Sequence, residues 1–349
     1  MKTSSATGLS AAAADFPARV VQWQRTQGRS GLPWQATRDP YRVWLSEIML
    51  QQTQVATVLA YYARFLERFP HVRALADATQ DEVLGLWSGL GYYSRARNLH
   101  RCAQAVVTAH GGEFPRSAQV LQSLPGIGRS TAAAIAAFCF GERVAILDGN
   151  VKRVLARVRG FAGDLAQARE ERALWDLAQG LVPPDAADMP AYTQGLMDLG
   201  ATVCTARAPQ CAACPAQDLC AAHREGEPTR YPVRTRKLKR SAQSLWLLRA
   251  QRADGAVWLE KRPQQGIWAG LYCLPVFDSH EALRAAVPAR LGLEDRTPFL
   301  HVLTHKDLHL HPVAVAFNRG SPSGAGAWFG AGQWPALGLP APVRKLLEG

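Results

Sequence analysis

Three features are scarce in this chain of 349 residues, and each scarcity excludes a class of protein. No apolar run approaches the roughly 20 residues of a membrane span, which argues against a membrane protein. Residues 1–15 lack the continuous apolar core of a secretory signal, so we expect a disordered tail there and a protein of the reducing cytoplasm. Acidic residues are few, 28 against 40 Lys and Arg, and the net charge of +12 makes a polyanion the natural partner.

The length favours about two domains rather than one core. Hydrophobic residues form 48% of the chain and charged ones 19%, which is typical of globular material. Residues 16–224 have apolar positions three or four apart, broken by Pro and Gly, which predicts a helical domain. Residues 225–242 are basic and contain proline, which indicates a linker. In residues 243–349 apolar and polar residues alternate as they do in strands, which predicts a small α+β domain.

Asp39 before Pro40 predicts a helix start, with Asp39 as the N-cap and a helical segment running to about Phe69, where one bend is allowed. Further helices are expected at Gln80–Trp87, Ser94–Ala109, Arg129–Phe140, Asn150–Val158, Glu170–Leu181 and Tyr192–Leu199. In the last domain the pattern predicts strands at Ser244–Arg249, Ala256–Lys261, Leu271–Phe277 and Val313–Phe317, and a helix around His280–Arg290.

Four cysteines lie within one short loop, namely Cys204, Cys211, Cys214 and Cys220. Four thiolates this close together can surround one compact centre, and we favour a [4Fe–4S] cluster. Zinc is the rival, although zinc loops usually contain two close cysteine pairs and only Cys211 and Cys214 are spaced in that way. Disulfides are disfavoured in a chain without a secretory signal. Cys102, Cys139 and Cys273 lie in apolar surroundings and are interpreted as core residues.

The segment 124–130 joins two helical stretches through Gly126 and Gly128, which let the backbone approach a partner closely. The following helix offers free N–H groups that suit a DNA phosphate, so the predicted role is positioning on DNA. An ordinary helix–helix turn would have a similar composition.

Two carboxylates stand in unusual places. Asp148 lies between an apolar run and a basic helix, where an N-cap role would also explain it. Glu47 lies in an apolar stretch of a predicted helix, so that it either snorkels outward or is desolvated. Desolvation would keep Glu47 protonated near neutral pH, which is what a general acid requires.

Several of these segments together are similar to a known family. They are Leu32–Gln35, Trp44–Val55, Gly89–Asn98, the hairpin 124–130, Leu147–Arg153 and the cysteine loop. They resemble the adenine-specific branch of the helix-hairpin-helix iron–sulfur DNA glycosylases. The resemblance implies a base excision repair enzyme that acts as a monomer on double-stranded DNA and removes adenine mispaired with 8-oxoguanine or guanine.

The related endonuclease III branch carries a lysine two positions after the last glycine of the hairpin, and that lysine attacks the sugar to form a Schiff base. This chain has Ser130 there, and a hydroxyl cannot form that imine. The resemblance therefore implies hydrolysis of the glycosidic bond without efficient strand cleavage.

The resemblance also implies roles for individual residues. Glu47 protonates adenine N7, the Asp148 carboxylate stabilises the oxocarbenium ion, and Asn150 helps to hold Asp148 and the water. Other residues are expected at the DNA: Trp34 and Gln194 near adenine, Leu50, Gln51, Gln52 and Thr53 beside the lesion strand, and Leu90 and Tyr92 near 8-oxoguanine. Tyr92 could equally be an ordinary core residue.

The segment 265–275 resembles the start of a Nudix-like domain, but the closely spaced glutamates that bind Mg²⁺ in Nudix hydrolases are missing around 281–284. A binding role remains. In the family a Phe-Ser-His loop recognises 8-oxoguanine, and the matching residues here are Leu303, Thr304 and His305. Loss of the aromatic puts the packing of that loop in question. His309 and His311 are expected to be strand residues.

A DNA-binding protein that scans duplexes without catalysis is the alternative from another class. Glu47 and Asp148 discriminate between the two, because a pure binder needs no acid in an apolar helix beside a second carboxylate. A structural and a redox role of the cluster are both compatible with the sequence, and we favour the structural one because a bound cluster contributes folding free energy.

Overall fold

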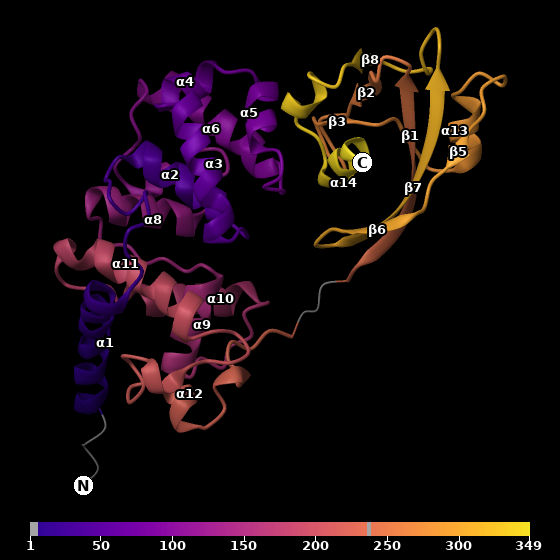
Figure 1. Cartoon of the computed structure of the whole chain (residues 1–349). Helices are drawn as coiled ribbons and strands as arrows, with labels where there is room; N and C mark the ends of the chain where they lie inside the picture. The colour runs from indigo at the N-terminus through magenta and orange to yellow at the C-terminus, as the bar shows by residue number, and fades with distance from the viewer. Residues whose placement is uncertain (1–5, 236–238) are drawn as a thin grey trace. The chain divides into compact units, whose positions relative to one another are not determined.

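The computed structural model describes residues 6–235 and 239–349, and it divides into two compact units (Figure 1). The first unit comprises Met1–Gln52 and Ala105–Lys237, and the second comprises Thr53–Gln104 and Leu238–Gly349. The division cuts across the helical domain expected from the sequence, since residues 53–104 group with the C-terminal sheet. No helix in the described ranges is long and apolar enough to cross a membrane.

The first unit is helical. Its helices are α1 (Ala6–Gln27), α2 (Pro40–Leu50), α7 (Ala118–Leu121), α8 (Arg129–Phe140), α9 (Gly149–Arg159), α10 (Ala168–Gln179), α11 (Met189–Asp198) and α12 (Ala221–Arg224), and short turns of helix occupy Ala186–Asp188, Leu199–Val203, Cys211–Ala213 and Pro228–Arg230. Helix α1 begins at Ala6, within the segment that the sequence predicts to be a disordered tail, and the alanines at 11–14 favour helix. Residues 1–5 lie outside the described ranges.

The helix boundaries agree closely with those expected. Asp39 caps α2 by accepting a hydrogen bond from Tyr41 N, and Pro40 takes the first helical position. The predicted segment to Phe69 is two helices, because the chain breaks at 51–54, where Gln52 adopts a left-handed φ of 56°. This break separates α2 from α3 (Val55–Arg68).

The second unit combines helices with a mixed sheet. Its helices are α3, α4 (Val72–Asp77), α5 (Gln80–Trp87), α6 (Ser94–His110), α13 (His280–Ala285) and α14 (Ala341–Glu348), and residues from 105 onward of α6 belong to the first unit. The strands are β1 (Ser241–Arg252), β2 (Val257–Lys261), β3 (Tyr272–Cys273), β4 (Val276–Phe277), β5 (Glu294–Asp295), β6 (Phe299–Val302), β7 (Lys306–Phe317) and β8 (Gly326–Phe329).

The sheet is built on a long parallel pair, β1 and β7, in register from Ser241 opposite Lys306 to Arg252 opposite Phe317. The other pairings are antiparallel, and the order β3-β2-β1-β7-β5 is joined by β4 on β1, β6 on β7 and β8 on β2. The expected α+β class is confirmed. The predicted strand 271–277 is two short strands flanking Pro275, and α13 ends at Ala285, before Pro288.

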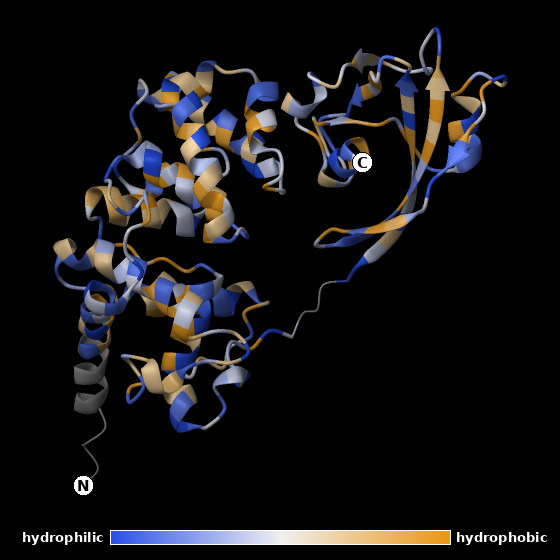
Figure 2. Ribbon diagram, in the orientation of Figure 1, coloured by the Kyte–Doolittle hydropathy of each residue, from blue (hydrophilic) through white to orange (hydrophobic). Residues whose placement is uncertain are grey.

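Hydrophobic and hydrophilic residues interleave along β1 and β7 (Figure 2), so each face of the sheet has its own core. Leu245, Leu247 and Leu310 lie in one cluster, and Leu248 and Val313 lie in the other. His311 is a strand residue, as expected, and its ring stacks on Trp246 at 4.5 Å between centroids.

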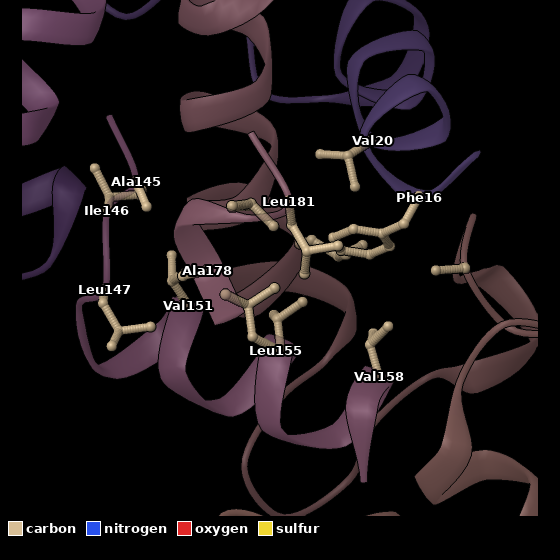
Figure 3. Close-up of a cluster of buried hydrophobic side chains, with 14 of the residues drawn as sticks. Phe16, Val20, Ala145, Ile146, Leu147, Val151, Leu155, Val158, Ala178 and Leu181 are labelled. Atoms are coloured by element: carbon tan, nitrogen blue, oxygen red, sulfur yellow. The ribbon is translucent and has the colours of Figure 1, made fainter. Parts of the chain in front are cut away.

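The main core of the first unit gathers α1, α9, α10, α11 and the extended segment 144–147 (Figure 3). Leu147 is 2% exposed and lies in this cluster with Val151 and Leu155. Because Asp148 follows Leu147 directly, its backbone is fixed by a packed core rather than carried on a free loop.

Candidate active site and cysteine loop

Glu47 lies on α2 and lines a cavity of about 450 Å³ in the first unit. Its neighbours on the helix, Ser46 and Ile48, are buried. The side chain keeps some exposed area but lies deep among protein atoms, and burial raises the pKa of Glu47 to about 8, with the charge of Asp148 as a second cause. Of the two alternatives left by the sequence, the structure favours desolvation.

The same cavity is lined by Trp34 and Gln194, the two residues expected near adenine. Trp34 is 7% exposed and Gln194 is half-buried on α11. Arg29, Gln24 and Phe138 also line it, so an aromatic wall stands beside polar and charged groups. A cavity that combines apolar walls with a few polar groups suits a flat heterocycle.

Asp148 is the N-cap of α9 and accepts a hydrogen bond of 2.7 Å from Val151 N. The capping role allowed by the sequence is thus confirmed, and it coexists with the electrostatic effect of Asp148 on Glu47. The segment before Asp148 is held by side chains, since Leu147 N donates to Ser130 Oγ at 3.1 Å and Ala145 N donates to Gln179 Oε1 at 3.0 Å. Ser130 therefore helps to fix the backbone next to this carboxylate.

Asn150 accepts a hydrogen bond of 2.9 Å from Arg153 Nη2. Arg153 also donates to the carbonyl oxygens of Gly200, at 2.6 Å, and Cys204, at 2.7 Å. One guanidinium therefore joins Asn150, two positions after the α9 cap, to the start of the cysteine loop. The printed sequence gives no hint of this connection, because its members are about 50 residues apart.

The hairpin between α7 and α8 has the geometry expected of a close-approach turn. Gly126 has a φ of 77°, a conformation that glycine adopts readily, and Gly128 is the N-cap of α8. A Cβ at Gly128 would meet no atom within 4 Å. The backbone N–H groups at the start of α8 are thus approachable from outside.

The four loop cysteines line one small pocket, together with apolar residues that include Val154, Leu199 and Val203. None of them forms a disulfide. Arg157 Nη1 lies 3.4 Å from Cys204 Sγ and donates to the Thr205 carbonyl, and Nη2 donates to the Ala206 carbonyl, so that this side chain holds the loop against α9. Within the described ranges, no three His, Cys, Asp or Glu side chains are arranged to hold a metal ion.

Cys102 and Cys273 are buried and Cys139 is half-buried, in keeping with the expected core roles. Burial raises the pKa of each of these three thiols to about 12.

Comparison with known proteins agrees with this architecture. Residues 45–179 match the HhH-GPD superfamily of base excision DNA repair proteins, and residues 246–349 match the NUDIX domain. An adenine DNA glycosylase from Buchnera aphidicola (subsp. Acyrthosiphon pisum) is 36% identical over 341 residues, which cover 95% of this chain and 97% of that protein. The chain belongs to the adenine DNA glycosylase family.

Other similar proteins match about 60% of the chain. The adenine DNA glycosylase of Rattus norvegicus is 48% identical over 217 residues, 60% of this chain and 42% of the rat protein. A thermostable thymine-DNA glycosylase superposes with a TM-score of 0.56 at 29% identity, over 62% of this chain and 99% of that one. Endonuclease III in a non-covalent DNA complex shares the fold, with a TM-score of 0.51 at 21% identity, over 64% of this chain and 99% of that one.

Three other residues that are expected to contact DNA, Thr53, Leu90 and Tyr92, lie around Arg95 in the second unit. Tyr92 is 46% exposed with a φ of 47°, so it is not a core residue, whereas Leu90 is 6% exposed. Arg95 donates to Thr53 Oγ1 at 3.0 Å and to the Leu90 carbonyl at 3.2 Å, and its guanidinium lies 5.6 Å from the centre of the Tyr92 ring. Arg95 thus organises three expected contact residues, although the sequence did not single it out.

Thr304 and His305 are exposed at the turn between β6 and β7. The Thr304 hydroxyl lies 3.1 Å from the Tyr92 hydroxyl, so the structure brings these two expected contacts together. Leu303 packs against the core of the sheet. Leu303 therefore anchors the base of this turn.

Proposed function

We propose that this protein is a monofunctional adenine DNA glycosylase that hydrolyses the N-glycosidic bond of adenine mispaired with 8-oxoguanine or guanine. The observation that carries the proposal is Glu47, an acid that lines a cavity and whose pKa is raised to about 8 by burial and by the charge of Asp148. A protein that only scans duplexes has no need of this pair. Family membership supports the same conclusion.

Glu47 is the proton donor in the proposed mechanism. Since its pKa is about 8, it is mostly protonated at neutral pH and can give its proton to adenine N7. Protonation turns adenine into a better leaving group, and positive charge develops at C1′ as the bond breaks. Asp148 stabilises that charge as a carboxylate or captures C1′ covalently before water completes the hydrolysis.

Asp148 and its surroundings position the second carboxylate. Ser130 and the core around Leu147 fix the backbone beside it, and Asn150 helps to hold the attacking water. A carboxylate that is already held in place stabilises the charge of the transition state, and the surrounding groups do not have to reorient during the reaction. Ser130 provides no amine, so the reaction is hydrolysis and no Schiff base forms with the sugar.

The target adenine has to leave the base stack to reach the cavity, which costs a few kcal/mol and less at a mismatch. In this proposal Trp34 and Gln194 contact the flipped base. The hairpin glycines 126 and 128 let the start of α8 bind a phosphate. The remaining residues contact DNA around the lesion, namely Leu50, Gln51, Gln52, Thr53, Leu90, Tyr92, Thr304 and His305.

Excision assays test the function. Purified protein is incubated with duplexes that contain A opposite 8-oxoguanine, G or C, and the product is heated in alkali, which breaks only abasic strands. We expect breakage at A opposite 8-oxoguanine and G.

The variants Glu47→Gln and Asp148→Asn should each abolish single-turnover excision while duplex binding persists, and the exposed Glu67→Gln should behave as wild type. Excision at wild-type rates by either active-site variant would refute the assignment.

Borohydride distinguishes hydrolysis from lyase chemistry, because it traps an imine between protein and sugar. We expect no stoichiometric protein–DNA adduct on the A:8-oxoguanine duplex. An adduct in high yield would show that a lysine of this chain attacks the sugar.

We further propose that Cys204, Cys211, Cys214 and Cys220 hold a [4Fe–4S] cluster. Four thiols that line one apolar pocket, in a loop held by Arg157, suit a shielded iron–sulfur centre, and such a centre would link the loop to α9. Its proposed contribution is folding free energy.

Cys211→Ser should lower the bound iron and sulfide from about four of each per chain, whereas Cys102→Ala should keep them. Zinc in place of iron in the purified protein would support the rival ligand.

We propose that the protein acts as a monomer on double-stranded DNA in the cytoplasm. Its net charge of +12 supports a nucleic-acid partner. Sedimentation of the protein with and without a lesion duplex tests the stoichiometry, and one chain per duplex is the expected result.

A further inference from the structure

Asp198, at the end of α11, is the most densely hydrogen-bonded acid behind the Glu47 cavity. It is fully buried, with 0% exposure, and does not itself line the cavity. One carboxylate oxygen accepts from Arg29 Nε and from Gln194 Nε2, each at 2.8 Å, and lies 2.7 Å from Arg29 Nη2 in an ion pair. The other accepts from Arg29 N at 2.9 Å and Gln24 Nε2 at 3.1 Å.

Every group around Asp198 in these contacts is a donor. A carboxylate paired with a guanidinium can only accept, so it dictates which end of a neighbouring side-chain amide faces it. The NH₂ groups of Gln194 and Gln24 must point to Asp198, and their oxygens must point elsewhere. Gln194 lines the cavity, and the group it can present there is therefore a hydrogen-bond acceptor.

We infer that Asp198 is a positioning residue that sets base specificity, by holding the Gln194 amide with its oxygen available to the exocyclic amine at position 6 of adenine. A purine with a 6-oxo group presents an acceptor at the same place, and two acceptors that face each other repel. This inference rests on the proposed function. It adds that the choice between 6-amino and 6-oxo purines depends on a buried acid that never touches the base.

The test compares excision of adenine and hypoxanthine from otherwise identical duplexes, each base opposite 8-oxoguanine, under single-turnover conditions. In Asp198→Asn the new amide must turn its NH₂ toward donors. We expect the NH₂ to face the Arg29 guanidinium, whose side chain is 34% exposed and can bind water, so that the Arg29 backbone N–H keeps its acceptor. Gln194 shares the guanidinium side of Asp198, so its amide then has to turn over. We expect the ratio of adenine to hypoxanthine excision rates to fall about tenfold or more. A misfolded fraction lowers both rates equally and leaves the ratio unchanged.

A double-mutant cycle shows whether Asp198 acts through Gln194. Gln194→Met should lower the ratio by itself, and adding Asp198→Asn should change it no further. The control Asp15→Asn removes another acid paired with an arginine of the same unit, through Arg19 at 2.7 Å, and should keep the wild-type ratio. An unchanged ratio in Asp198→Asn, or equal rates for both bases in the wild type, would overturn the inference. Failure of the wild type to release adenine would instead refute the proposed function.

Discussion

At the scale of single residues, Glu47 is placed where its ionisation costs stability. Its pKa is raised from the ordinary 4.5 of a glutamic acid to about 8, mainly by burial and further by the charge of Asp148. Between these values the unfolded chain loses the proton while the folded chain keeps it. The folded state is therefore progressively destabilised as pH rises through this window, and the full cost is present above about pH 8.

Glu47→Gln removes that cost, because an amide does not ionise. We expect this variant to be about as stable as the wild type near pH 4 and more stable by on the order of a few kcal/mol near pH 9, as measured by urea unfolding. The excision rate of the wild type should fall as pH rises above about 8, because the proton donor is lost. A stability difference that does not depend on pH would contradict the raised pKa.

Ser130 has a structural task that a comparison with lysine-bearing relatives does not suggest. Its hydroxyl accepts from Leu147 N, one residue before Asp148. Ser130→Ala leaves this partly buried N–H without its acceptor, so we expect excision to slow by about tenfold with little change in duplex affinity. Ser123→Ala is a matched control, since the Ser123 hydroxyl bonds only the Val120 carbonyl of its own turn in the described structure. Equal rates for the two variants would exclude a positioning role.

At the scale of elements, the loop 88–93 that carries Leu90 and Tyr92 is anchored by the end of the chain. Tyr93 donates its hydroxyl to the Leu339 carbonyl at 2.7 Å, and Arg344 of α14 donates to Ser88 Oγ at 3.0 Å. Tyr61 donates to the Ser88 carbonyl at 2.8 Å. These contacts lie within the second unit and give the turn a fixed shape.

Tyr93→Phe removes one of these anchors and leaves the Leu339 carbonyl without it. We expect a loss of about 1 kcal/mol in unfolding free energy, and a larger loss of affinity for the lesion duplex than for an undamaged one, relative to the wild type. Thermal unfolding and duplex titration measure the two effects. As a comparison, Tyr272→Phe loses a longer contact of 3.4 Å to Asp81 and should leave lesion affinity unchanged. A Tyr93 variant with wild-type lesion affinity would mean that the loop keeps its shape without this bond.

At the scale of the whole molecule, the charge of +12 predicts how binding responds to salt. Each phosphate that the protein neutralises releases counterions, so the logarithm of affinity should fall linearly with the logarithm of salt concentration. We expect at least a tenfold loss of affinity for any duplex between about 50 and 200 mM salt. Fluorescence anisotropy with matched lesion and undamaged duplexes checks this. An affinity that did not respond to salt would exclude phosphate contacts as its main source.

The sequence by itself determined the elements and the chemistry that they carry. Helical periodicity and the Asp39–Pro40 start depend on neighbouring residues, and so does the close spacing of the four cysteines, which is why each was recognisable from the sequence. Glu47 stood out because an acid in an apolar helix is unusual. Pro275 and Pro288 also lie in the sequence, but the strand break and the early end of α13 were not predicted from them.

Only the tertiary structure decided how distant residues work on one another. The raised pKa of Glu47 requires a specific burial and the nearby charge of Asp148, which lies 101 positions later in the chain. The roles of Arg95 and Asp198 depend on donors and acceptors that come from separate elements. No local sequence pattern predicts such contacts, because hydrogen bonding and desolvation depend on distances in space and not on spacing along the chain.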